Sequence, residues 1–222
     1  MLNLKWSNMK DKFCKVLDNE YFWAYFALFG ALIQTVVFLF TQDSYLSFIS
    51  GLAGVFSVVL CSEKSISGFY FWSFLQIITF TIICFQEQLW GKLVENAFYF
   101  ITMLVGLIIW SRNKREEKVV PREMKIRNLL ILCFVNVLGV ISVNLWLGGT
   151  NDSMPFMDSL TTVTAIIAQI LMITRYREQW IFWVAVDIAS IVLWASIGNY
   201  YMVIQYVFWT LNCFYGYYKW GR

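Results

Sequence analysis

The chain contains no histidine and only two prolines among its 222 residues. Without histidine it lacks the commonest metal ligand and the usual general base near neutral pH, so enzyme mechanisms lose much of their support. Charged residues are also scarce, at 14% of the chain, whereas ordinary soluble domains carry roughly 25%. Apolar residues take their place, since 59% of the chain is hydrophobic and 19% is aromatic. This composition predicts an integral membrane protein.

Paired cysteine motifs are missing as well. The five cysteines are scattered, form no C-x-x-C and mostly lie in apolar stretches, so they indicate neither a disulfide framework nor a zinc site. They are Cys14, Cys61, Cys84, Cys133 and Cys213. We expect no cofactor and no metal. The net charge of +3 does not indicate a nucleic-acid partner, because the basic residues lie in short gaps between apolar stretches, where membrane topology requires them.

Apolar stretches long enough to cross a bilayer occur eight times. A spanning helix needs about 20 mostly apolar residues, which predicts helices near 21–40, 45–61, 68–86, 91–110, 128–147, 156–174, 179–197 and 200–220. Lys and Arg fall in alternate gaps, as cytoplasmic loops require. The opposite gaps, 41–44, 86–90, 148–155 and 198–199, contain neither. We therefore predict an all-α protein of the plasma (inner) membrane with both termini in the cytoplasm.

An internal repeat relates these helices. The run Thr41-Gln-Asp-Ser44 matches Thr150-Asn-Asp-Ser153 at an offset of 109 residues. The set Phe98-Tyr99, Gly106 and Trp110 matches Phe208-Trp209, Gly216 and Trp220 at an offset of 110. Two copies of three helices run parallel in the membrane when one linker helix separates them. Gly106 and Gly216 are expected to allow close helix packing in both copies.

The predicted organisation has five parts. They are a cytoplasmic N-terminal segment (1–20), an additional transmembrane helix (21–44), a first three-helix repeat (45–110), a basic cytoplasmic loop with the linker helix (111–147) and a second three-helix repeat (148–222). The first part is polar and lacks the small-residue cleavage site of a signal peptide. Parallel repeats of this kind place their substrate where the copies meet, near the membrane midplane.

Polar side chains at mid-depth are the candidates for a substrate site, because lipid does not satisfy their hydrogen bonds. They are Gln76, Thr102, Asn136, Thr161, Thr162, Thr164, Asp187 and Asn212. Gln76 and Asp187 stand at nearly equivalent places in the two copies. The same holds for Thr102 and Asn212. Each has a structural alternative, since threonines often bond to their own helix, and Asn136 and Asn212 also suit interhelical hydrogen bonds.

Asp187 differs from the others, because a charge at the membrane centre costs about 2.5 kcal/mol or more. No Lys or Arg lies at mid-depth to pair with it. The carboxyl group is therefore protonated, hydrogen-bonded in a wet cavity, or opposite a cationic ligand. Trp183 lies one helical turn before Asp187 on the same face of the predicted helix, a stripe of polar and aromatic residues. An indole face beside an acid favours a flat cation. The pair predicts an aromatic or heteroaromatic substrate.

Tryptophans at helix ends usually form the aromatic belt at the membrane surface. Trp90, Trp110, Trp146 and Trp220 are expected in that belt. Trp180 lies beside the basic residues Arg175 and Arg177, so a belt position is one of the roles open to it.

Several runs resemble the PnuC-type nicotinamide riboside transporters. They are Asp158-Ser-Leu-Thr161-Thr162, Ala168-Gln169, Glu178-Gln-Trp180-Ile-Phe-Trp183 with Asp187 one turn on, and Asn212 with Gly216 and Trp220, together with the earlier Asn96, Phe98, Tyr99 and Trp110. The likeness covers most of residues 45–220. It implies a fold related to the SWEET sugar transporters, with two three-helix bundles and a linker helix. It also implies facilitated diffusion of an unphosphorylated vitamin, which a cytosolic kinase then traps by phosphorylation.

By position, the resemblance makes Trp180 a gate and Trp183 a stacking platform. It makes Gln76, Gln169 and Asn212 binders of ribose and carboxamide. Many family members carry Asn where this chain has Asp187, and the family also includes thiamine and riboflavin transporters. Nicotinamide riboside and thiamine are flat cations that suit an acid, whereas riboflavin is neutral, so we rank the three substrates in that order.

Other function classes stay open on sequence alone. A membrane enzyme needs an acid–base or nucleophile pair, and one acid without histidine makes a poor one. An accessory subunit of a larger complex is the remaining alternative. Proton coupling through Asp187 and assembly into a homo-oligomer are also left open.

Overall fold

The computed structural model describes residues 14–41, 44–86, 90–149, 154–196, 198 and 200–222. The long helices in these residues are α2 (Phe22–Thr41), α3 (Tyr45–Ser62), α4 (Ile66–Gln86), α5 (Trp90–Arg112), α6 (Ile126–Leu147), α7 (Pro155–Ile173), α8 (Gln179–Ser196) and α9 (Tyr200–Trp220). Their ends agree with the predicted ones to within two residues. The short strands β1 (Lys114–Arg115) and β2 (Lys118–Val119) pair antiparallel between α5 and α6. The centre of the first Thr-x-Asp-Ser run and all of the second lie outside the described residues.

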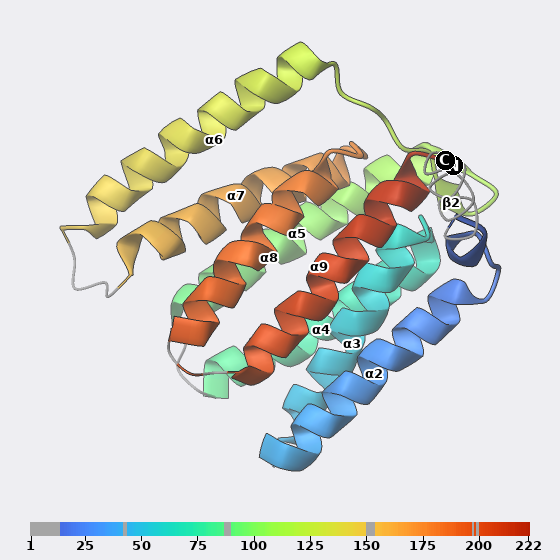
Figure 1. Cartoon of the computed structure of the whole chain (residues 1–222), viewed down its shortest axis with the longest axis horizontal. Helices are drawn as coiled ribbons and strands as arrows, with labels where there is room; N and C mark the ends of the chain where they lie inside the picture. The colour runs from blue at the N-terminus through green and yellow to red at the C-terminus, as the bar shows by residue number, and fades with distance from the viewer. Residues whose placement is uncertain (1–13, 42–43, 87–89, 150–153, 197, 199) are drawn as a thin grey trace, which may run out of the picture.

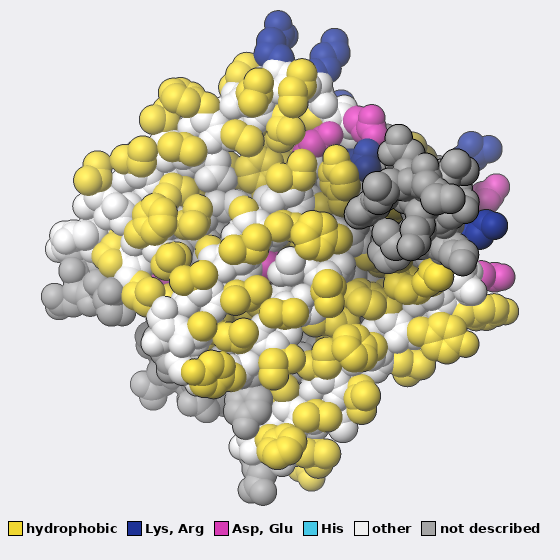
Figure 2. All heavy atoms as spheres, viewed as in Figure 1, with side chains coloured by type: hydrophobic (Ala, Val, Ile, Leu, Met, Phe, Trp, Pro, Cys, Tyr) yellow, Lys and Arg dark blue, Asp and Glu magenta, His cyan; other side chains and the backbone are white. Residues whose placement is uncertain are grey.

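Most of the helices have the length and apolar composition of membrane-spanning segments. Six helices in the described residues meet both conditions, namely α2, α3, α4, α6, α7 and α8. Helices α5 and α9 are long enough, at 23 and 21 residues, but α5 begins with several polar residues and α9 is rich in tyrosine. Figure 2 shows hydrophobic side chains over most of the visible face and Lys and Arg along one edge. The chain is therefore an all-helical membrane protein apart from its short hairpin.

Six of the described helices form a closed ring. Helices α3, α4 and α5 pack in succession, as do α7, α8 and α9. The ring closes at two seams, where α3 lies against α9 and where α5 lies against α7. Helix α2 packs on α3 and helix α6 packs on α7, at opposite edges of the molecule (Figure 1). Each half of the chain thus contributes three successive helices to the ring and one further helix to its edge.

The ring has a basic end, which is the end where α3, α5, α7 and α9 finish. The hairpin, both described termini and the turns α3–α4 and α7–α8 lie at this end (Figure 1). The described Lys and Arg residues gather there, with the exception of Lys92 in the first turn of α5. This segregation follows the alternation of charge that the sequence predicts.

One buried apolar cluster fills the ring at the basic end. All six ring helices contribute to it, and so does the hairpin. Its members are Cys61, Ile66, Phe69, Tyr70, Met103, Trp110, Val119, Met172, Ile173, Trp180, Cys213 and Trp220. We call this set the basic-end cluster. It contains the side chains that close the ring on the side of the charged loops.

The belt prediction is wrong for Trp110 and Trp220, whose side chains are buried in the basic-end cluster. The indole nitrogen of Trp110 donates to the carbonyl of Met172 at 3.1 Å, and that of Trp220 donates to the carbonyl of Cys61 at 2.9 Å. Because these bonds satisfy the N–H groups, the rings need no polar membrane surface. Trp146 is 71% exposed, so a belt position for it stays a prediction, and the side chain of Trp90 lies outside the described residues.

These two bonds are equivalent in the two halves of the chain. Each joins the last turn of a third helix to the last turn of the first helix in the other half. The turns that follow those first helices also match, since Lys64 has φ 63° and Arg175 has φ 69°. Both seams of the ring are therefore fastened at the basic end in the same way.

The predicted close packing at the two glycines is confirmed. A Cβ atom on Gly106 would lie 2.7 Å from Tyr70 Oη and 2.8 Å from Ile173 Cγ2. A Cβ atom on Gly216 would collide with the indole ring of Trp180. Tyr70 and Trp180 hold equivalent positions in α4 and α8, so each glycine admits a large aromatic side chain from the preceding helix.

We expect Trp110→Phe and Trp220→Phe each to lower the stability of the purified protein by about 0.5–1.5 kcal/mol, because each variant loses one buried hydrogen bond across a seam. The Met172 and Cys61 carbonyls keep their backbone bonds from Arg175 N and Lys64 N. Thermal unfolding in detergent measures the effect. Trp146→Phe is the matched control, since its side chain is exposed, and it should leave the unfolding temperature unchanged. Equal stability of all three variants would contradict the role assigned to the indole bonds.

Candidate functional site

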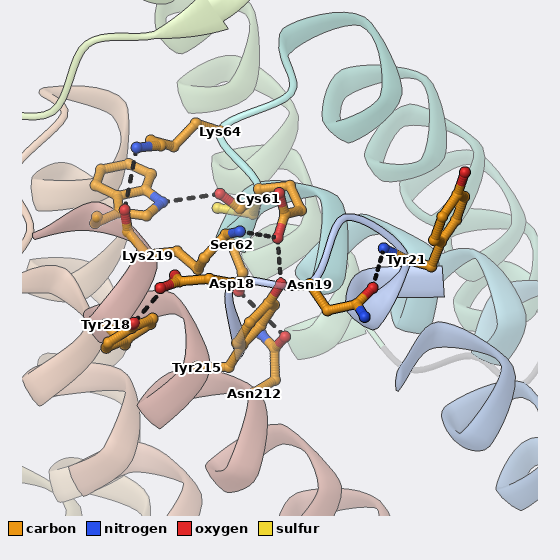
Figure 3. A network of polar contacts seen from close by, with 12 residues as sticks. Asp18, Asn19, Tyr21, Cys61, Ser62, Lys64, Asn212, Tyr215, Tyr218 and Lys219 are labelled. Atoms are coloured by element: carbon orange, nitrogen blue, oxygen red, sulfur yellow. Dashed lines mark hydrogen bonds and ion pairs between the residues drawn. The ribbon is translucent and has the colours of Figure 1, made fainter. Parts of the chain in front are cut away.

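The predicted polar residues meet at the two seams of the ring. Across the α5–α7 seam, Gln169 Nε2 donates to Thr102 Oγ1 at 2.9 Å. Across the α3–α9 seam, Asn212 Nδ2 donates to the Val58 carbonyl at 3.1 Å. Asn212 Oδ1 accepts from Ser62 Oγ at 3.1 Å (Figure 3). Thr102 and Asn212 are the pair that the repeat makes equivalent. Their side chains hold the two halves of the ring together by polar contacts inside an apolar environment.

A polar layer lies directly next to the basic-end cluster. Its residues are Gln76, Thr102, Gln169, Asp187 and Asn212. Thr102 and Asn212 each precede a member of the cluster, Met103 and Cys213, in the chain. Gln169 lies one helical turn before Met172, another member. These five polar residues come from five of the six ring helices. The hydrogen bonds join Gln169 to Thr102, and Asp187 to Cys213, the residue after Asn212.

Asp187 is the acidic residue of this layer. It is 3% exposed, and its Oδ2 accepts a hydrogen bond from Cys213 Sγ at 3.4 Å. Among the described residues no Lys or Arg forms an ion pair with it. A thiol is a weak donor, so the carboxyl group keeps capacity for a stronger partner. This arrangement suits a cationic or hydrogen-bonding ligand.

Trp183 lies one turn from Trp180 and is half-buried. Its ring packs against the basic-end cluster, together with Phe74, Ile77 and Leu107. Asp187 follows one turn further along α8. An indole and a carboxylate therefore stand in succession on one helix, where the polar layer meets the cluster, which agrees with the stripe that the sequence predicts.

Trp180 lies inside the cluster and contacts Trp220 edge to face, with ring centroids 5.9 Å apart and planes at 85°. Its burial is incompatible with a lipid-facing belt position, because a belt residue exposes its ring at the membrane surface. The role of Trp180 as a gate stays a prediction. Its Nε1 atom has no hydrogen-bond partner among the described residues.

Gln76 stands on α4 opposite Gly54 of α3. A Cβ atom on Gly54 would lie 2.9 Å from Gln76 Nε2, so the glycine makes room for the amide. Gln76 is half-buried and is next to Ile77, which packs against the basic-end cluster. A role for Gln76 in binding stays a prediction.

Three other predicted residues lie apart from the polar layer. Asn136 Nδ2 donates to Thr164 Oγ1 at 3.2 Å, which joins α6 to α7. Thr161 Oγ1 donates to the Met157 carbonyl of its own helix at 2.9 Å, and Thr162 is exposed. These contacts correspond to the structural alternatives of the sequence analysis, since buried amides and hydroxyls in lipid need partners within the protein. The structure does not bring these residues to the polar layer.

Sequence reasoning missed an aromatic group one turn further from the basic end. Tyr99 precedes Thr102 by three residues and Trp209 precedes Asn212 by three, at the repeat offset of 110. Trp209 contacts Tyr206 edge to face at 5.0 Å, and its buried Nε1 atom has no partner among the described residues. Tyr99 Oη donates to Glu95 Oε1 at 3.4 Å. The repeat match at residues 98–99 and 208–209 contains both positions, so it is the signal that could have identified them as candidate site residues.

The chemistry of the site favours binding over catalysis. Within the described residues no group of three or more His, Cys, Asp or Glu side chains gathers to hold a metal ion. A groove of about 480 Å³ lies between α4 and α5, lined by residues that include Thr81, Asn96 and Phe100, and it contains none of the polar layer. The layer itself offers amides, a carboxyl group and a nearby indole, which recognise a flat polar molecule by hydrogen bonds and stacking.

Comparison with known proteins agrees with this description. The nicotinamide riboside transporter PnuC of Haemophilus influenzae is 32% identical over 196 residues, which cover 86% of this chain and 85% of that protein. The PnuC transporter of Neisseria mucosa is 29% identical over 203 residues, covering 86% and 77% of the two chains. That of Escherichia coli is 29% identical over 197 residues, covering 75% and 81%.

A solved structure and a family match extend the likeness to the fold. The crystal structure of the vitamin B3 transporter PnuC superposes with a TM-score of 0.75 at 29% identity, and the match covers 90% of this chain and 91% of that one. The family described as nicotinamide mononucleotide transporter matches residues 44–222. Because this match spans both halves of the ring, the chain belongs to the nicotinamide mononucleotide transporter family.

Proposed function

We propose that this chain carries nicotinamide riboside across the membrane by facilitated diffusion. The observation that carries the proposal is the polar layer beside Trp183, enclosed by a ring of apolar helices and closed at one end by the basic-end cluster. A closure on one side of a binding layer is what alternating access requires. The relatives named as nicotinamide riboside transporters support the choice of substrate.

The proposed topology has eight membrane-crossing helices, with the basic end and both termini in the cytoplasm of the plasma (inner) membrane. Helices α5 and α9 cross the membrane together with the six more apolar helices, because neighbouring helices cover part of their polar surface at the seams. The residues 45–110 and 148–222 form two parallel three-helix repeats. The matched indole bonds, the matched glycines and the matched turns support this division.

Asp187 is the proposed determinant for a cation. The pyridinium ring of nicotinamide riboside carries a positive charge, which a buried carboxylate attracts strongly at low dielectric. The amides of Gln76 and Gln169 lie in the same layer and suit the ribose hydroxyls and the carboxamide. Thiamine is the second candidate, since it is also a flat cation, and neutral riboflavin is the third. Binding of all three to the purified protein would rank them directly.

The transport cycle needs no coupling ion in this proposal. The riboside equilibrates across the membrane, and a cytosolic kinase keeps the internal concentration low by adding a phosphate. A phosphate group adds negative charge that a layer built around Asp187 repels. The trapped product therefore does not leave by the same route.

Purified protein in liposomes should equilibrate labelled nicotinamide riboside to the same concentration inside and outside, without a proton or sodium gradient. Protein-free liposomes measure the leak. Accumulation above equilibrium that depends on either gradient would overturn the facilitated-diffusion mechanism, and no uptake at all would overturn the proposed function.

Trp183→Ala should weaken nicotinamide riboside binding by about tenfold or more, because the stacking of one base on an aromatic side chain contributes about 1–3 kcal/mol. Isothermal titration of the purified protein measures the affinity. The matched control is Trp194→Ala, since Trp194 is a half-buried tryptophan on the same helix and lies about three turns away. An unchanged affinity in Trp183→Ala would mean that Trp183 packs against the cluster and does not stack on the riboside.

Asp187→Asn should preserve the fold and lower the affinity for nicotinamide riboside and thiamine more than that for riboflavin. The substitution keeps the shape and removes the charge, and only the two cations depend on that charge. Competition binding with the three vitamins measures the selectivity. If the variant retains its preference for cations, the charge of Asp187 is not the discriminator.

A further inference from the structure

The segment that links the two halves of the chain lies across the basic end and binds both halves. The backbone N–H of Val119 donates to the Lys64 carbonyl at 2.9 Å, in the α3–α4 turn. Three residues later, Arg122 N donates to the Arg175 carbonyl at 2.7 Å and the Arg122 carbonyl accepts from Arg177 N at 2.9 Å, in the α7–α8 turn. We call residues 118–124 the strap. It connects the two equivalent turns whose central residues, Lys64 and Arg175, have positive φ.

Val119 is the part of the strap that enters the ring. Its side chain is 2% exposed and belongs to the basic-end cluster, whereas the next residue, Val120, is 46% exposed. The cluster around it contains Cys61, Trp110 and Trp220, and thus both indoles that fasten the seams. The linker therefore completes a closure that the six ring helices do not make alone.

The two ends of the strap are held unequally. On the α7–α8 side, Arg175 Nη1 donates to the Val120 carbonyl at 2.9 Å, Met124 N donates to Glu178 Oε1 at 2.9 Å, and Arg177 pairs with Glu123 at 3.1 Å. These bonds add to the two backbone bonds of Arg122. On the α3–α4 side, the described residues form two backbone bonds. They are the bond from Val119 N to the Lys64 carbonyl and a longer one, 3.3 Å, from Ile66 N to the carbonyl of Glu117, the residue before the strap.

Like charges lie near both ends of the strap. Burial, and after it the ammonium groups of Lys118 and Lys219, lower the pKa of Lys64. Burial and then the guanidinium group of Arg122 lower the pKa of Arg175. At the α7–α8 turn the Arg177–Glu123 ion pair offsets this repulsion, whereas at the α3–α4 turn Lys118 of the strap lies near Lys64. Charge and hydrogen bonds therefore both favour separation at the α3–α4 side.

The closed cluster also leaves polar atoms without partners. Tyr70 Oη, Trp180 Nε1 and both side-chain polar atoms of Gln179 are buried without a hydrogen-bond partner among the described residues. A buried polar group without a partner is destabilising, and water would satisfy it. Opening of the basic end to water would therefore remove part of the free-energy penalty of these buried polar atoms, and so favour the open state.

We propose that Val119 is a gating residue that the linker supplies to the ring. When the basic end opens, the strap stays on the α7–α8 turn, the α3–α4 side separates, and Val119 leaves the cluster. This inference rests on the proposed transport function, because it assigns the closure to the path of the substrate.

Cys61 serves as the reporter for this gate, since it is buried in the same cluster as Val119. The experiment uses the full chain in liposomes, with Cys61 as the only cysteine and serine at positions 14, 84, 133 and 213. The rate of Cys61 alkylation by N-ethylmaleimide measures how often the cluster admits solvent. Uptake of labelled nicotinamide riboside is measured on the same preparations.

We expect Val119→Ala to raise the alkylation rate about tenfold or more and to change the uptake rate, while the matched control Val120→Ala changes neither. Val119→Thr keeps the shape and adds a buried hydroxyl, so it should act in the same direction if Val119→Ala does not fold. Equal alkylation rates for variants at 119 and 120 would overturn the gate. Faster alkylation without riboside uptake in any variant would overturn the transport function and leave the strap as the closure of the ring.

Discussion

Two hydrogen bonds from indole nitrogens to backbone carbonyls fasten the ring on which the rest of the structure depends. Trp110 and Trp220 each end a third helix, and each donates to the last turn of a first helix in the other half. Both carbonyls also accept a backbone bond from the following turn, Met172 from Arg175 N and Cys61 from Lys64 N. The indole bond therefore satisfies a buried N–H group and joins the two helices of one seam. The buried rings then form the centre of the basic-end cluster, and the clearances at Gly106 and Gly216 follow from how closely the helices approach.

A second constraint acts at mid-depth, where lipid leaves no water for polar side chains. Thr102, Gln169 and Asn212 meet it by bonding across the seams. Asp187 meets it only in part, through a thiol. Thr102, Gln169 and Asn212 thus hold the ring together, whereas the weak bond of Asp187 agrees with the proposal that its carboxyl group binds a ligand.

The linker between the halves has a structural role beyond connecting them. A covalent connection of this length is free to lie outside the bundle, yet it forms a hairpin, binds both equivalent turns and inserts Val119 into the cluster. The indole bonds at the two seams match, but the linker occurs once, so the basic end is not symmetric. The linker binds the α7–α8 turn by more hydrogen bonds than the α3–α4 turn, so the two sides of the basic end are held unequally.

The helices, their ends and the alternation of charge could be predicted from the sequence alone, because they depend on local length, hydropathy and spacing. The proposed repeat also comes from the sequence, since it rests on matched residues at an offset of 109–110. It also singled out Trp183 and Asp187, since an acid within an apolar helix is conspicuous in one dimension. The burial of Trp110 and Trp220, the bonds from Asn212 to α3 and the insertion of Val119 from a charged loop into the core became visible only in the folded protein. Burial depends on which distant segment covers a given face, and helical periodicity carries no information about that partner.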